Sequence, residues 1–308
     1  MPAITAAIVK ELRDKTGVGM MDCKKALSET SGNIEEAVDW LRKQGLAAAA
    51  KKAGRVASEG LIGVATKGND AAIVEINSET DFVSRNSAFQ SVVNEVAILA
   101  LECSGDIDKL KNYPFPGTNR NVEEEIKQLV VTIGENINLR RISSLTINNG
   151  VIGSYVHAAT VDGLGRIGVI VAIESENTDE EELTTLAHQL AMHIAAASPQ
   201  SVSVADLSKE DLERERKVLT EQAAVSGKSP DIVDKMVEGR LRKFYEEVVL
   251  LNQKFVIDGE TQVAEIISTI SKNIGNPITV TGFRRYELGE GIEIEKINFA
   301  DEVAAQLE

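Results

Sequence analysis

The stretch that decides the fold is GLIGVATKGNDAAIVEINSETDFVSRN, residues 60–86. Two apolar runs, GLIGVAT and AAIVEIN, flank the turn KGND, and this order predicts an antiparallel hairpin of two strands. A polar connection follows, and then apolar residues recur at helical spacing. These residues are Phe89, Val92, Val93, Val96 and Leu99. The stretch therefore predicts one strand–strand–helix unit.

The same unit recurs in the second half of the chain. The run NGVIGSYVHAAT, residues 149–160, matches EGLIGVAT, and GVIVAIESEN matches AAIVEINSET. A second helix is expected over residues 183–197, ending before Pro199, because the residue before a proline disfavours helix. The repeat predicts a core of two related subdomains. A last strand, residues 278–288, is expected to join the second subdomain.

The segments around the repeat differ in composition and periodicity, and together they predict the α+β class. Residues 1–45 show three helical stripes, the third starting after Asn33 as N-cap and ending at Gly45. Lys51, Lys52 and Arg55 are expected to form a solvated face. In chain order we expect a helical module at 1–45, a helical or extended linker at 46–59, one core subdomain at 60–145 and a second at 146–205 and 256–290. We also expect an inserted antiparallel helical hairpin at 206–255 and a C-terminal helix at 291–308. The seam of the hairpin is expected to include Leu212, Leu219, Val237, Leu241, Phe244, Val248 and Leu251.

Composition narrows the function classes. The 308 residues are 43% hydrophobic and 26% charged, with a net charge of −15 that repels phosphate backbones and disfavours general nucleic-acid binding. No apolar run approaches the roughly 20 residues of a membrane helix. The start of the chain lacks the pattern of a signal peptide, so we expect a cytoplasmic protein with reduced Cys23 and Cys103. Two cysteines and three histidines predict no cysteine-rich metal site.

Motifs that usually carry chemistry are weak in this chain. The run GLGRIG, residues 163–168, satisfies a dinucleotide fingerprint, but a strand follows it at once, so a hairpin turn is expected instead. GKS at Gly227 lacks the glycine of a phosphate loop, since Gln222 stands there. His188 and His193 lie five apart on one helix and therefore on different faces, one of them packed. No arrangement of nucleophile and base is recognisable, so no enzyme is expected.

The connection after the first hairpin contains four candidate contact residues: Thr80, Asp81, Phe82 and Val83. Two readings of Phe82 are equally favoured. It folds back on Phe89 as a hydrophobic staple, or it stands out beside Asp81 as an aromatic interface anchor. The second copy of the unit has TDEE at residues 178–181, so the scaffold itself does not require the aromatic.

A second candidate contact lies in TGVGMMDCKKAL, residues 16–27, where a glycine turn precedes Met20 and Met21 at a helix start. Both methionines fill the core of the small module, or one faces outward, where adaptable methionines suit protein binding. The residues leave these alternatives equally open.

Five stretches together resemble a known family: TGVGMMDCKKAL, INSETDFVSRN, IGENINLRR, GSYVH and MVEGRLRKF. They are similar to the elongation factor Ts family, the guanine nucleotide exchange factors of elongation factor Tu. The resemblance runs in order from Ile4 to about Glu302. It implies a module like ubiquitin-associated domains, a linker, a two-part core, an inserted helical hairpin and a C-terminal helix.

The resemblance also implies roles for particular residues. Thr80, Asp81, Phe82 and Val83 match the family's motif that enters the GTPase domain near its Mg²⁺. Val18, Gly19, Met20 and Met21 match the part of the module that contacts the same domain, and His157 matches a further contact position. The expected function is non-enzymatic: to bind elongation factor Tu–GDP, displace Mg²⁺ and loosen the phosphate site, so that GTP rebinds. It implies no cofactor, metal, small-molecule substrate, nucleic acid or membrane. The competing hypotheses are a plain adaptor and an enzyme that uses GLGRIG.

Overall fold

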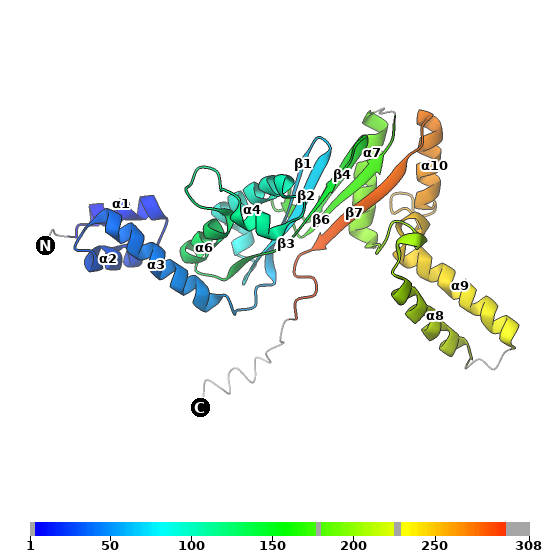
Figure 1. Ribbon diagram of the computed structural model, residues 1–308, viewed down its shortest axis with the longest axis horizontal. Coiled ribbons are helices and arrows are strands. Elements are labelled where there is room, and N and C mark those ends of the chain that lie inside the picture. Colours follow the sequence, from blue (N-terminus) through cyan, green and yellow to red (C-terminus); the bar gives the residue numbers. More distant parts are fainter. Residues whose placement is uncertain (1–3, 177–179, 225–228, 294–308) are drawn as a thin grey trace.

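The computed structural model describes residues 4–176, 180–224 and 229–293. It is an elongated α+β chain, with helices at both ends and the sheets between them (Figure 1). The helix expected at 291–308 falls almost wholly outside the described residues, as do Thr178 and Asp179 of the TDEE comparison.

The N-terminal module, residues 4–52, consists of α1 (Ala6–Thr16), α2 (Met20–Glu29) and α3 (Ile34–Lys52). Asn33 caps α3, its side-chain oxygen accepting from the backbone N–H of Glu35 and Glu36. The expected end of this helix at Gly45 is wrong, because α3 continues to Lys52. Gly45 is a point of close approach instead: a Cβ there would lie 2.6 Å from a methyl carbon of Val131 on α6 (Val122–Ile133). The first part of the expected linker is therefore helical.

In the described ranges the strands form two antiparallel sheets. The first sheet has the order β3-β2-β1-β5, with β1 (Glu59–Lys67), β2 (Asp70–Ser78), β3 (Ile137–Thr146) and β5 (Leu164–Gly165). Its core includes α4 (Ser87–Ala100) and α6 (Val122–Ile133), with α5 (Ile107–Asn112) between them in sequence. Phe89, Val93 and Val96 of α4 are fully buried, which confirms the predicted apolar face.

The second sheet has the order β4-β6-β7, with β4 (Gly150–His157), β6 (Ile167–Glu174) and β7 (Thr279–Glu287). The helices α7 (Glu180–Ala197) and α10 (Val263–Ile274) contribute to its core. The strand predicted to close this subdomain is confirmed as β7, which pairs with β6. Gly163 and Gly165 of GLGRIG lie in the β4–β6 connection, as expected, whereas Gly168 lies in β6 itself. Unexpectedly, β5 within that connection pairs with β1 and so joins the two halves of the core.

The internal repeat is longer than the sequence indicates. Gly60 and Gly150 open the two units with φ of +125° and +133°. A Cβ would lie 2.2 Å from the carbonyl oxygen of Ile76 in the first unit and 2.0 Å from that of Ile173 in the second. Each second strand also pairs with a third strand through a register shift. The two units therefore share a third strand as well as a hairpin and a helix.

The inserted helical hairpin consists of α8 (Lys209–Ala224) and α9 (Pro230–Val248), which project from the second subdomain (Figure 1). Its seam confirms four of the predicted positions: Leu219, Val237 and Leu241 are buried, and the partly buried Leu212 packs against them. The prediction that Leu251 belongs to this seam is wrong. It follows the end of α9, in the short turn η4 (Leu250–Asn252), and packs against the core of the second subdomain.

Candidate functional site

The 80–83 turn, formed by Thr80, Asp81, Phe82 and Val83, connects β2 to α4 and presents its aromatic to solvent. Phe82 is 76% exposed, whereas Val83 is 3% exposed and packs in the first core. Phe89, the expected staple partner, is fully buried without it. The folded-back alternative for Phe82 is therefore wrong, and the aromatic stands beside the exposed carboxylate of Asp81.

Hydrogen bonds on both sides fix the backbone of this turn. The Ser78 hydroxyl donates to the carbonyl of Thr80 at 3.0 Å, and the Ser84 hydroxyl donates to the carbonyl of Asp81 at 2.6 Å. Asn86 then caps α4 by accepting from two backbone N–H groups of its first turn. Small polar residues around the motif thus hold the backbone while the side chain of Phe82 stays free.

One further residue contacts the turn from far along the chain. The backbone N–H of Thr80 donates to Oε2 of Glu135 at 2.9 Å, and the Thr80 hydroxyl donates to Oε1 of the same carboxylate at 2.6 Å. Sequence reasoning missed Glu135. It lies within IGENINLRR, a stretch used only as a family signature, and its carboxylate is one among 48 acidic residues.

The second candidate surface lies at the start of α2. Met20 is 43% exposed and Met21 76% exposed, so the alternative that both fill the core is wrong. Gly19 is exposed and precedes the helix as its N-cap residue. Val18 is 3% exposed and packs in the core of the module. Two flexible apolar side chains therefore face solvent above a packed support.

His157 ends β4, an edge strand of the second sheet, and is exposed. Its Nδ1 lies 3.2 Å from the hydroxyl of Tyr155, and the ring of Tyr155 meets His188 edge-on at 5.8 Å between centroids. The structure thus brings two histidines together around one tyrosine, which the sequence did not indicate. His193 lies on the other face of α7 and is fully buried, as predicted for one of the pair.

These three surfaces do not converge on one pocket. The turn belongs to the first subdomain, the methionines to the N-terminal module and His157 to the second subdomain, and Figure 1 shows these parts spread along the molecule. A small ligand cannot span such a distribution, whereas the face of another protein can. In the described ranges, no set of three or more His, Cys, Asp or Glu side chains is arranged to hold a metal ion. Nor does any described helix have the length and apolar character needed to cross a membrane.

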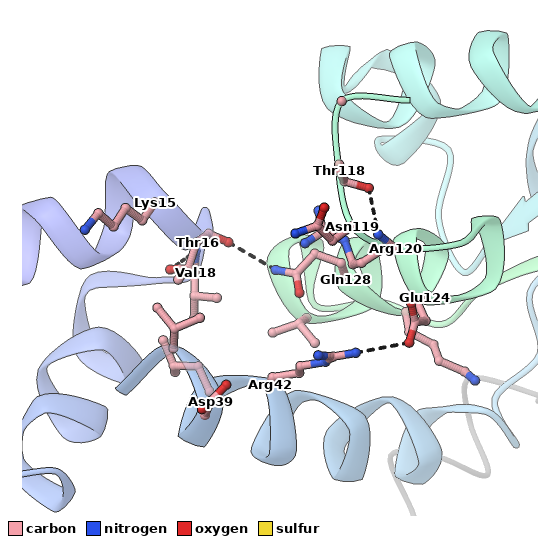
Figure 2. A pocket seen from close by; sticks show the side chains of 15 residues that line it. Lys15, Thr16, Val18, Asp39, Arg42, Thr118, Asn119, Arg120, Glu124 and Gln128 are labelled. Atoms are coloured by element: carbon pink, nitrogen blue, oxygen red, sulfur yellow. Dashed lines mark hydrogen bonds and ion pairs between the residues drawn. The ribbon is translucent and has the colours of Figure 1, made fainter. Parts of the chain in front are cut away.

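A groove of about 470 Å³ lies elsewhere, between the N-terminal module and α6 (Figure 2). Arg42 pairs with Glu124 across it at 3.1 Å, and the side-chain amide of Gln128 donates to the carbonyl of Thr16 at 3.1 Å. These contacts join the module to the first subdomain. The groove is accordingly a seam between parts of the chain.

Comparison with known proteins shows which family the chain is similar to. A family model described as "Elongation factor TS" matches residues 79–290. A protein of Rhodospirillum rubrum named elongation factor Ts is 57% identical over 308 residues, covering 100% of this chain and 99% of the relative. Its namesake in Rhodospirillum centenum is 56% identical over 305 residues, 99% of each chain. The one in Bartonella bacilliformis is 52% identical over 303 residues, 98% of each.

Proposed function

This chain belongs to the elongation factor Ts family, and from that membership and the exposed pair Asp81 and Phe82 we propose that it is a guanine nucleotide exchange factor for elongation factor Tu. The observation that carries the proposal is the 76% exposure of Phe82 on a turn whose backbone is held on both sides. An exposed aromatic beside a carboxylate on a rigid junction is suited to insertion into a protein partner.

The mechanism follows from how a GTPase holds GDP. Backbone donors and a lysine bind the phosphates, and Mg²⁺ bridges their oxygens. In our proposal Phe82 wedges between helices of the GTPase domain, and Asp81 disturbs the water shell of the partner's Mg²⁺. The phosphate site loosens, GDP leaves, and GTP rebinds. Thr80 and Val83 hold the two ends of this wedge.

The energetics require more than the turn. Linkage is reciprocal: if the factor weakens the binding of GDP to the GTPase, GDP weakens the binding of the factor to the GTPase by the same amount. An acceleration of about ten-thousand-fold requires a barrier lower by about 5.5 kcal/mol. One buried Phe side chain contributes roughly 1.5–3 kcal/mol. We therefore propose that Gly19, Met20, Met21 and His157, with Val18 as support, supply binding energy that the turn directs at the phosphate region.

In this proposal the protein changes a binding equilibrium and a release rate, and no covalent bond is made or broken. It therefore acts without enzymatic chemistry, a cofactor or a small-molecule substrate. The proposed partner is a protein, with no direct nucleic-acid or membrane contact, and the proposed location is the cytoplasm, where translation takes place.

Stopped-flow release of fluorescent GDP from elongation factor Tu tests the proposal directly. With unlabelled GDP in excess, a sub-stoichiometric amount of this protein should exchange the fluorescent GDP of the whole GTPase population, because each molecule acts repeatedly. An adaptor would instead bind elongation factor Tu and leave the release rate at its spontaneous value. That second result would overturn the proposal.

A further inference from the structure

The loop that joins α6 to β3, residues 134–136, contacts the 80–83 turn through Glu135 and is named here the support loop. Gly134 ends α6 with φ of +90°, a conformation that favours glycine, and its N–H donates back to Val130. The chain turns there, and Glu135 accepts the two hydrogen bonds that Thr80 donates, at 2.9 and 2.6 Å. Bonds to an ionised carboxylate are stronger than neutral ones.

The support loop also holds the strand end before the turn. The backbone N–H of Asn136 donates to Oε1 of Glu79 at 2.5 Å, and its side-chain amide donates to the carbonyl of Arg55 at 2.8 Å. Arg55 in turn pairs with Glu79 at 3.4 Å. The residue before the turn and its first residue are therefore bound to the same three-residue loop.

The same loop receives the end of the N-terminal module. Nζ of Lys52, the last residue of α3, donates to the carbonyl of Gly134 at 2.6 Å. Arg55 is exposed, as expected for a solvated basic face, whereas Lys52 is half-buried, and both side chains have defined acceptors. The module that carries Met20 and Met21 and the turn that carries Phe82 converge on one support.

We propose that Glu135 is a positioning residue for nucleotide exchange: it fixes the 80–83 turn through Thr80 so that Asp81 and Phe82 meet the partner in one geometry. The proposal rests on the exchange function above. Its physical basis is preorganisation, since a turn that is ordered before binding loses less conformational freedom when it inserts. Glu135 itself lies beneath the turn and needs no contact with the partner.

The test compares two substitutions at Glu135 with a matched control. Glu135→Ala removes both bonds to Thr80. Glu135→Gln keeps an acceptor for the Thr80 N–H, and its amide donates to the Thr80 hydroxyl once that hydroxyl reverses its direction. The control is Thr146→Val, because the Thr146 hydroxyl donates to Asp70 at 2.7 Å between β3 and β2, at the end of these strands opposite the turn.

The measurement is stopped-flow release of fluorescent GDP from elongation factor Tu over a range of exchange-factor concentrations. For Glu135→Ala we expect the maximal rate to fall about tenfold while the half-saturating concentration changes less than about threefold, because the other contacts still bind. Glu135→Gln should retain at least about a third of the maximal rate, since a neutral hydrogen bond remains. Thr146→Val should match the unaltered protein.

The outcomes separate the two proposals. If the unaltered protein accelerates release and folded Glu135→Ala does so equally, the positioning role is overturned and the exchange function stands. If Thr146→Val loses as much rate as Glu135→Ala, general weakening of the sheet explains the loss and the positioning role is again overturned. If the unaltered protein gives no acceleration, both proposals fall. Should Glu135→Ala not fold, Thr80→Val removes the hydroxyl bond alone, and an unchanged maximal rate there overturns the role.

Discussion

The backbone N–H of Gly289 donates a hydrogen bond of 2.9 Å to Oε1 of Glu75, a carboxylate 214 residues earlier in the chain. Glu75 lies on β2 of the first sheet and is fully buried, whereas Gly289 follows β7 of the second. Arg140 and Arg141 on β3 both pair with the same carboxylate, and the guanidinium of Arg141 lies 4.1 Å from the ring centroid of Tyr286. One buried charge therefore joins the two subdomains.

This arrangement predicts an acid-sensitive contribution to stability. Burial raises the pKa of Glu75, but hydrogen bonds from Gly289, Asn77 and Arg141 and the charge of Arg141 outweigh it, so the pKa lies below the usual 4.5. The folded state then binds the proton less tightly than the unfolded state. The stabilisation is present above about pH 4.5 and is lost as the pH falls through the lowered value of the folded state.

The substitution Glu75→Gln tests the prediction. It should lower the free energy of unfolding in urea by about 3 kcal/mol near neutral pH, since it removes the buried carboxylate that two half-buried arginines share. Its stability should also fall less between about pH 5 and 3 than that of the unaltered protein. The control is Glu59→Gln, which breaks the exposed pair with Arg166 and should cost less than about 1 kcal/mol. Parallel pH curves for Glu75→Gln and the unaltered protein would contradict the assignment.

The two phenylalanines on either side of the α4 N-cap should separate function from folding. Phe82→Ala should change the free energy of unfolding by no more than about 0.5 kcal/mol, because the side chain is 76% exposed. It should lower the rate of GDP release by roughly tenfold or more, the equivalent of about 1.5 kcal/mol of lost contact. Phe89→Ala should instead cost about 3–5 kcal/mol of stability, because Phe89 is fully buried. Urea unfolding and stopped-flow release measure the two effects, and an unchanged release rate in Phe82→Ala would remove the wedge from the mechanism.

Local patterns predicted much of the fold, and the structure shows why the remainder escaped. Alternating apolar residues revealed the hairpins, since one face of each strand must be buried. The third strand of each unit lies far along the chain from the hairpin. The second strand with which it pairs also differs between the units: Glu75 stands at the register shift in the first sheet and Ala172 in the second. In one unit this position holds a buried carboxylate bound by two arginines, and in the other it holds an alanine. The two sequences therefore share no pattern here from which the repeat could be recognised.

The candidate site likewise has a part that local sequence predicted and a part that only the structure shows. An aromatic between charges identified Phe82 from the sequence, and its exposure then decided between the two readings. The partner of Thr80 is 55 residues away and contacts it only because α6 ends at Gly134. Such long-range polar contacts have no period in the sequence. Likewise, the sequence favoured Gly45 as a helix end because glycine commonly ends helices, but packing against Val131 explains that residue.

The exposed methionines give a third prediction. Met21→Ala should leave the free energy of unfolding within about 0.5 kcal/mol of the unaltered value, because Met21 is 76% exposed. It should weaken association with nucleotide-free elongation factor Tu, measured by isothermal titration calorimetry, by several-fold, as expected for an adaptable apolar contact. Leu27→Ala on the same helix removes a fully buried side chain and should cost about 2–5 kcal/mol of stability. Unchanged affinity in Met21→Ala would exclude this side chain from the interface.

The fourth prediction concerns the base of the helical hairpin, where His193 accepts a hydrogen bond at Nδ1 from the Val256 N–H at 3.2 Å and its Nε2 faces Oε1 of Gln253 at 2.9 Å. This pattern fits the neutral ring with its proton on Nε2. Burial lowers the pKa of His193 below 6.5, although the bond to Gln253 opposes this.

Protonation of His193 places a second N–H against that of Val256, so the unfolded state binds the proton more readily and stability should fall as the pH drops below about 6.5. Urea unfolding at about pH 7.5 and 5.5 measures the change. His193→Gln should be less stable at the higher pH but should lose less between the two values, because it cannot titrate. The double variant His157→Gln, His188→Gln alters only exposed rings and should keep the full pH dependence. If His193→Gln also kept the full pH dependence of the free energy of unfolding, a group other than His193 would be responsible for it.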